Sequence, residues 1–220
     1  MLFVPLSNCN KRELKDANKI YQLTGRVTKL IDEKEFPCAE INQTLAKFPK
    51  TFVKSSFCSF KNAEVPVQPV TTFDDLYNQM VKCRRFHSEM EHADRNGNDW
   101  QLVFSEWINC PQQFEFRVFV HNGRVKGISQ QLWYKEFNWI TNLEQAMFDA
   151  IVARVDKFVK DSGYAFCTID VFYVNNKCHI IEVNPPCLGG FSTGSALFNW
   201  NDHTKWNDPN EIFVLLNTFK

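Results

Sequence analysis

The sequence predicts an α+β fold built mainly from antiparallel sheets. Two stretches, 114–131 and 165–184, alternate apolar and polar residues around an Asn-containing turn, and a third, 142–161, carries apolar residues at helical spacing. Alternation with a period of two is typical of strands that bury one face, whereas a 3.6-residue period is typical of a helix packed on a core. Because hairpins and helices follow one another without a strict strand–helix alternation, antiparallel pairing is favoured over a parallel sheet.

The elements are expected in a definite order along the chain. Gly25 marks the end of the first helix, and Thr72 with Asp75 form a capping-box pattern at the start of the second. The tail, 211–219, is apolar and is expected to pack. In order, we expect a helix over 11–24, strands over 26–31 and 51–56, a helix over 73–86, a loop over 88–99, a strand over 100–108, the hairpin 114–131, a helix over 142–161 with Asn142 as its cap, and the hairpin 165–184.

Composition restricts the classes of function. The chain has 220 residues, of which 15% are aromatic, so it is long enough to bury a sizeable core. Its formal net charge is zero, so the chain as a whole has no bulk attraction to nucleic acid or membrane. No stretch reaches membrane-spanning length, and the first apolar run is short and broken by Pro5, unlike a signal peptide. None of the 8 cysteines has CxxC spacing, so zinc is not indicated and we expect a reducing, cytoplasmic location.

The first hairpin turns at Asn122-Gly123, a favoured two-residue turn. Such a turn predicts a core face of apolar residues on the first strand and a second face that carries charge. Taken alone, the charged face is best interpreted as an ordinary solvated surface. The predicted pairs are His121–Arg124, Phe119–Lys126, Arg117–Ile128 and Glu115–Gln130, and the predicted core residues are Phe114, Phe116, Val118 and Val120.

The second hairpin contains two acids, Asp170 and Glu182, inside apolar runs. A two-residue turn at Asn175-Asn176 would place them on opposite faces, whereas a three-residue loop over 175–177 pairs Asp170 with Glu182. We favour the three-residue loop because it places the apolar residues on one face. It also pairs Thr168 with Asn184, and the apolar face would be Ile169, Val171, Ile181 and Val183.

Two opposed carboxylates repel each other unless a cation lies between them. The oxygens of Asp170, Glu182 and Asn184 are hard ligands that suit Mg²⁺. The alternative is a solvent-facing hairpin with two chance acids, and the residues alone leave both interpretations open.

The stretch "FCTIDVFYVNNKCHIIEVNPPCLGGFSTGS" resembles the metal-binding strand pair of the ATP-grasp superfamily, over roughly 50–195 of this chain. The resemblance implies two α+β subdomains that clamp ATP with Mg²⁺. It also implies roles for residues. Asp170, Glu182 and Asn184 would bind the metal, and Glu106 with the backbone of Trp107 and Ile108 would contact the adenine. Glu115 would bind the ribose and Lys54 of "TFVKSS" the phosphates, with Lys61 as a further phosphate contact. Many ligases place an arginine at the position of Thr168, and here Arg117 or Lys126 would supply that charge.

Within that superfamily, "EFRVFVHNGRVKGISQ" and "FPKTFVKSSFCSFKNA" resemble the cell-division-cycle-123 family, which are assembly chaperones of a translation initiation factor with viral and bacterial relatives. The chain departs from that family in having Glu-Val-Asn at 182–184, which is closer to the ligases. The expected organisation is a reduced N-terminal segment (1–48), a small subdomain with the hinge (49–108), and a large subdomain with the metal-binding hairpin (109–220).

The function expected from this resemblance is that of an ATP-grasp ligase, which activates a carboxylate by phosphoryl transfer for attack by an amine. Lys54, Arg117 and Lys126 would be the catalytic cations. One alternative is a non-catalytic, ATP-dependent assembly chaperone whose partner is a protein. A second is an enzyme that joins RNA ends or transfers nucleotides, although the net charge of zero gives nucleic-acid binding no support.

Overall fold

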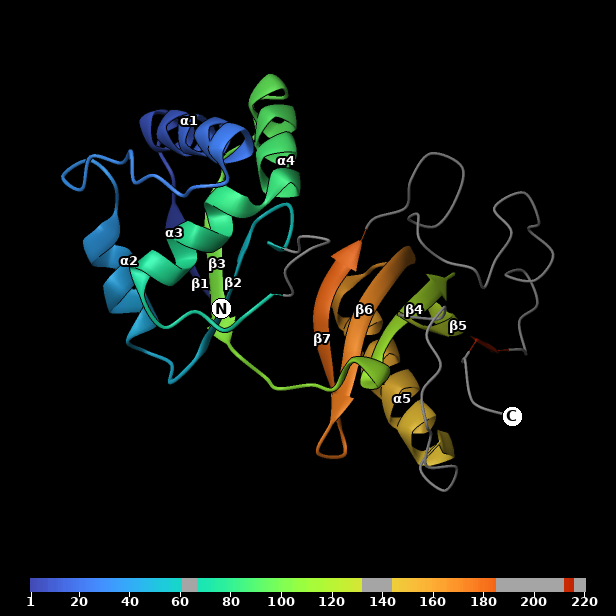
Figure 1. Cartoon of the computed structure of the whole chain (residues 1–220). Coiled ribbons are helices and arrows are strands. Elements are labelled where there is room, and N and C mark those ends of the chain that lie inside the picture. The colour runs from blue at the N-terminus through green and yellow to red at the C-terminus, as the bar shows by residue number, and fades with distance from the viewer. Residues whose placement is uncertain (61–66, 132–143, 185–211, 216–220) are drawn as a thin grey trace. The chain divides into compact units, whose positions relative to one another are not determined.

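The computed structural model describes residues 1–60, 67–131, 144–184 and 212–215, and the chain divides into two compact units, Met1–Ile108 and Asn109–Lys220 (Figure 1). Each unit combines helices with a sheet whose described strands pair in antiparallel fashion, apart from one parallel pair in the second unit. The predicted α+β class with mainly antiparallel sheets is confirmed.

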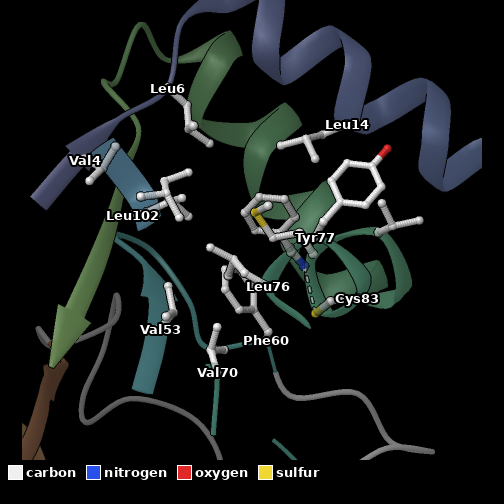
Figure 2. Packing of buried hydrophobic residues seen from close by; sticks show 14 of the residues in the cluster. Val4, Leu6, Leu14, Val53, Phe60, Val70, Leu76, Tyr77, Cys83 and Leu102 are labelled. Atoms are coloured by element: carbon white, nitrogen blue, oxygen red, sulfur yellow. Dashed lines mark hydrogen bonds between the residues drawn. The ribbon is translucent and has the colours of Figure 1, made fainter. Parts of the chain in front are cut away.

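The first unit packs helices on one face of a three-stranded sheet of order β1-β3-β2. Figure 2 shows the core between them, where Val4, Val53 and Leu102 of the strands lie with Leu14, Leu76 and Tyr77 of the helices. The elements are β1 (Leu2–Pro5), α1 (Asn8–Thr24), α2 (Cys38–Leu45), β2 (Thr51–Ser55), α3 (Phe73–Lys82), α4 (Arg84–Arg95) and β3 (Gln101–Glu106).

Local signals mark the helix ends. The Ser7 hydroxyl accepts from the backbone N–H of Asn10 at the start of α1, and Gly25 ends that helix in the left-handed region at φ 68°. Thr72 and Asp75 form the predicted capping box of α3. The predicted end of α1 and the predicted start of α3 are confirmed, whereas α1 begins earlier than the predicted residue 11.

Three predictions for the first unit are wrong. Residues 26–31 form no strand, and the predicted loop over 88–99 begins inside a helix, α4. The predicted helix over 73–86 is two helices, because Cys83 is extended, ends α3 and accepts from the Phe86 N–H at the start of α4. β1 and α2 were not predicted.

The second unit is a five-stranded sheet of order β7-β6-β4-β5-β8, and α5 covers one of its faces (Figure 1). The buried residues of α5 recur at helical spacing, as predicted: Met147, Ile151, Val155 and Val159. The predicted cap, Asn142, lies outside the described residues. The elements are a 3₁₀ turn (Gln112–Phe114), β4 (Glu115–His121), β5 (Arg124–Gln130), α5 (Glu144–Ser162), β6 (Phe166–Val174), β7 (Lys177–Asn184) and β8 (Phe213–Leu215), the last of which pairs in parallel with β5.

Within the described part of the chain, no helix combines the length and apolar character needed to cross a membrane.

Candidate functional site

The face of the second sheet that does not pack against α5 carries the polar residues of both hairpins. We call this face, made of Arg117, Ser129, Thr168, Asp170, Glu182 and Asn184, the polar face. Strand pairing sets these residues in rows across the sheet, because directly opposed residues share a face. One row is Glu182–Asp170–Arg117–Ser129, and the next contains Asn184, Thr168, Phe119 and Gly127.

The β4–β5 hairpin departs from the predicted register through a β-bulge. His121 pairs with Arg124 as predicted, but Phe119 pairs with Gly127 and Arg117 with Ser129. Lys126 is the extra residue, because Val125 pairs with Val120 and Gly127 with Phe119. The predicted pairs beyond the turn are therefore wrong by one residue. Bulges are common next to functional sites, where they redirect a side chain.

The β6–β7 hairpin reaches the predicted register by a different route. The predicted three-residue loop is wrong, because Val174 pairs with Lys177 around a two-residue turn whose residues, Asn175 and Asn176, have φ of 52° and 59°. Positive φ at both positions is typical of a type I′ turn. A bulge then adds one residue to β7, and beyond it Asp170 pairs with Glu182, as predicted.

The bulged residue of β7 is Ile181, which lies between the pairs Val171–Ile180 and Asp170–Glu182. Ile180 and Val183 pack against the core of the second unit. The prediction that Ile181 belongs to that apolar face is therefore wrong, whereas the predicted pairing of Thr168 with Asn184 is confirmed.

The polar face is not the solvated surface that the first hairpin alone indicated. Of its residues, Thr168 is 0% exposed, Ser129 2% and Asp170 4%, and Phe119, which lies in the row of Thr168, is also 0% exposed. Burial of ionisable groups is costly unless they are paired or bind a ligand. The predicted core residues of the same strand, Phe116, Val118 and Val120, do pack in the core.

Asp170 is paired with Arg117. The Arg117 Nε donates to Asp170 Oδ1 at 2.8 Å, and its Nη2 donates to Oδ2 at 2.9 Å, which is the two-point fork of a strong arginine–carboxylate pair. Burial alone would lower the pKa of Arg117, but the hydrogen bond and charge of Asp170, with the charges of Glu182 and Glu115, raise it above its ordinary value. Arg117 therefore stays charged.

Lys126 lies in the β5 bulge, beside Phe119 and Gly127. It is 5% exposed, and among the described residues none forms a hydrogen bond or ion pair with its ammonium group. A cation at a nearly buried position that has no counter-ion among the described residues is available to an anionic ligand.

The predicted Mg²⁺ ligands do not form a metal site in this structure. Both oxygens of Asp170 accept hydrogen bonds from Arg117, and the Asn184 side chain presents its N–H, not its carbonyl oxygen, to Asp170 at 3.5 Å. The donor set as arranged fits an ion pair and not a cation.

The remaining predicted site residues are not members of this row. Glu115 is on β4, half-buried and paired with Phe172. Lys54 of β2 pairs with Val103 in the first unit and is half-buried. The last three, Glu106, Trp107 and Ile108, end the first unit, where the Trp107 N–H donates to the Lys50 carbonyl at 2.9 Å. Lys61 and the Gly-rich stretch 187–195 lie outside the described residues.

One aromatic pair on the polar side of the hairpin was not predicted. The rings of Phe172 and His179 are stacked, with centroids 5.1 Å apart and an angle of 17° between their planes. The pairing of these residues follows from the two-residue turn and precedes the bulge at Ile181, so the predicted three-residue loop could not have found it.

Comparison with known proteins defines the class. The D123 family model matches residues 71–216 of the 220 in the chain. The chain therefore belongs to the D123 family, which confirms the predicted resemblance to the cell-division-cycle-123 branch.

Individual relatives and a solved structure agree with this assignment. A translation initiation factor eIF2 assembly protein of Candida albicans is 31% identical over 134 residues, covering 58% of this chain and 36% of the relative. Its namesake in Dictyostelium discoideum is 28% identical over 121 residues, covering 54% and 30%. The structure of Cdc123 from Schizosaccharomyces pombe matches with a TM-score of 0.68 at 17% identity, covering 93% of this chain and 87% of that one, and so shares the fold.

These comparisons correct the predicted function. The matched proteins are named as assembly proteins of an initiation factor, which contradicts the expected carboxylate-activating ligase and favours the chaperone alternative. The aligned segments span about a third of the length of these curated relatives.

Proposed function

We propose that this chain is a non-catalytic assembly factor that binds ATP and acts on a translation initiation factor of the eIF2 type. Membership of the D123 family and the names of the relatives support the choice of partner. The motifs that resemble the ATP-grasp superfamily support the choice of nucleotide. The observation that supports an anionic ligand is the position of Lys126, which is 5% exposed and has no counter-ion among the described residues.

Lys126 is suited to phosphate because an ammonium group acts as a compact point charge with three donors. It lies next to Phe119, which is 0% exposed, so the bulge is surrounded by low-dielectric material in which an ion contact is strong. Arg117, two positions from Phe119 on β4, is a second cation of the same hairpin. Lys54, Lys61, Glu106, Trp107, Ile108 and Glu115 stay predicted contacts of the nucleotide.

The non-catalytic role predicts that the chain does not turn over ATP, which distinguishes it from a ligase. Nucleotide binding that orders a surface for a protein partner requires no general base and releases no product. We expect ATP incubated with the chain and the subunits of the initiation factor to remain intact. Release of ADP or AMP above the protein-free control would contradict the non-catalytic role.

Nucleotide binding is tested by titration calorimetry of ATP into the wild-type chain and Lys126→Gln. Loss of a hydrogen bond to a charged group is worth about 1.5–3 kcal/mol, so we expect affinity to fall by about 10- to 150-fold. The matched control is Lys157→Gln, because Lys157 lies exposed on α5 and forms an i,i+4 ion pair with Asp161. Equal affinity in wild type and Lys126→Gln would refute the assignment of Lys126.

The partner is tested separately, by titrating each purified subunit of the initiation factor into the labelled chain with and without ATP. We expect one subunit to bind, and to bind more tightly when ATP is present. If no subunit binds under either condition, the assembly role is wrong, even where ATP binding has been measured.

A further inference from the structure

The Arg117–Asp170 pair occupies the position at which the hairpin would hold a cation. Asp170 faces Glu182 across β6 and β7 and faces Arg117 across β6 and β4, so the guanidinium lies in the same row as both acids. The side chains of Arg117 and Asp170 are 13% and 6% exposed. A fixed positive charge is therefore built into the row beside the two carboxylates.

The guanidinium and a divalent cation compete for the same lone pairs. A metal on Asp170 needs at least one carboxylate oxygen directed at it, at roughly 2.0–2.1 Å for Mg²⁺. Both oxygens are already acceptors for Arg117, at 2.8 and 2.9 Å. A cation that approached Asp170 would also meet the positive charge of Arg117 in a site of low dielectric constant.

Glu182 and Glu115 strengthen this arrangement. Glu182 lies in the row of Arg117, and Glu115 lies two residues before it on β4, so both carboxylates add attraction for the guanidinium. Arginine also holds a carboxylate at two points, which lysine cannot do. The exchange of Arg117 for a metal therefore requires the whole side chain to leave a nearly buried position.

We propose that Arg117 is an internal counter-ion that closes the Asp170–Glu182 pair to divalent cations. The acid pair is then a cation site in which arginine has replaced the metal, and removal of the guanidinium converts it into a site that a divalent metal can occupy. This inference does not rest on nucleotide binding, because it concerns the metal alone.

The test measures binding of Mn²⁺, without nucleotide, to the full chain by electron paramagnetic resonance of the free ion. In wild type we expect only background binding of Mn²⁺, which does not depend on Asp170. We expect Arg117→Gln to bind Mn²⁺ about 10–100-fold more tightly than this background, which is the range in which neighbouring groups change metal affinity. Asp170→Asn should leave wild-type behaviour unchanged, and adding it to Arg117→Gln should abolish the gained site. Arg124→Gln, which removes an exposed arginine of the same hairpin, is the matched control and should behave like wild type.

Arg117→Lys keeps the charge and removes the fork, so it serves if Arg117→Gln does not fold. We expect Mn²⁺ to raise the melting temperature of Arg117→Lys and to leave that of wild type unchanged. Asp170-dependent binding of Mn²⁺ to wild type would overturn the proposal. A folded Arg117→Gln or Arg117→Lys that gains no Asp170-dependent Mn²⁺ site would overturn it as well.

Discussion

The ion pair between Arg117 and Asp170 makes a quantitative prediction for stability. The two side chains are 13% and 6% exposed, and two hydrogen bonds of 2.8 and 2.9 Å join them. Arg117→Met leaves the Asp170 carboxylate buried without its partner, in the same row as the carboxylate of Glu182. Removing one member of a buried pair costs about 3–5 kcal/mol, so we expect the free energy of unfolding of the second unit to fall by that amount.

A double variant distinguishes the energy of the ion pair from the energy lost through poorer packing of the substituted side chains. Arg117→Met with Asp170→Asn removes both charges, and we expect the double variant to be more stable than the sum of the single losses predicts by at least about 2 kcal/mol. Because the chain has two units, urea unfolding is best followed by hydrogen exchange of peptides that cover β4 and β6. The control Arg124→Met, at an exposed position, should change stability by less than about 0.5 kcal/mol. A cost below about 1 kcal/mol for Arg117→Met, or additive single effects, would refute the reasoning.

Two further predictions concern the cores. His87 is buried in the first unit, and burial lowers its pKa from the ordinary 6.5 to about 4. The folded state then binds fewer protons than the unfolded state, so stability should be complete above the unfolded value and fall, by up to about 3 kcal/mol, as the pH drops from about 6.5 to about 4. His87→Gln should flatten this dependence of the urea midpoint, and an unchanged slope would contradict the assignment. In the second unit Ile151 of α5 is 0% exposed, so Ile151→Ala should lower the free energy of unfolding by about 2–5 kcal/mol and the control Ile151→Val by about 0.5–1.5 kcal/mol, while equal effects would show that no cavity forms.

Features of the fold that depend on local chemistry could be read from the sequence. Gly25 ends α1, Thr72 begins α3, and Asn122-Gly123 closes the first hairpin, because each position needs a particular side chain or backbone conformation. The helix α4 was missed because its polar residues resemble a loop. The apolar positions that hold it to the core, Phe86, Met90 and Ala93, are spaced by four and three residues.

The arrangement of the candidate site needed information that a single sequence does not carry. The residues of each hairpin could be paired approximately, but β4 and β6 are separated along the chain by β5 and α5. Nothing in the local pattern says that these strands are neighbours, so the contact between Arg117 and Asp170 could not be predicted. From the sequence we could identify the two acids, and we predicted a metal between them. In the structure, the group that contacts Asp170 is the guanidinium of Arg117.

The positions of the two bulges explain how the polar face is assembled. Lys126 is the extra residue of β5 and Ile181 that of β7, so each bulge lies in a strand that flanks the β4–β6 pair. That central pair runs from Glu115–Phe172 to His121–Phe166 without a shift in register. Because a two-residue turn alone would place Glu182 on the other face, the bulge at Ile181 is what returns Glu182 and Asn184 to the face of Asp170. The two-point contact between Arg117 and Asp170 requires that their strands stay in register, and it forms across β4 and β6, which pair without a bulge. The bulged strands β7 and β5, on either side of this pair, contribute Glu182, Asn184 and Lys126.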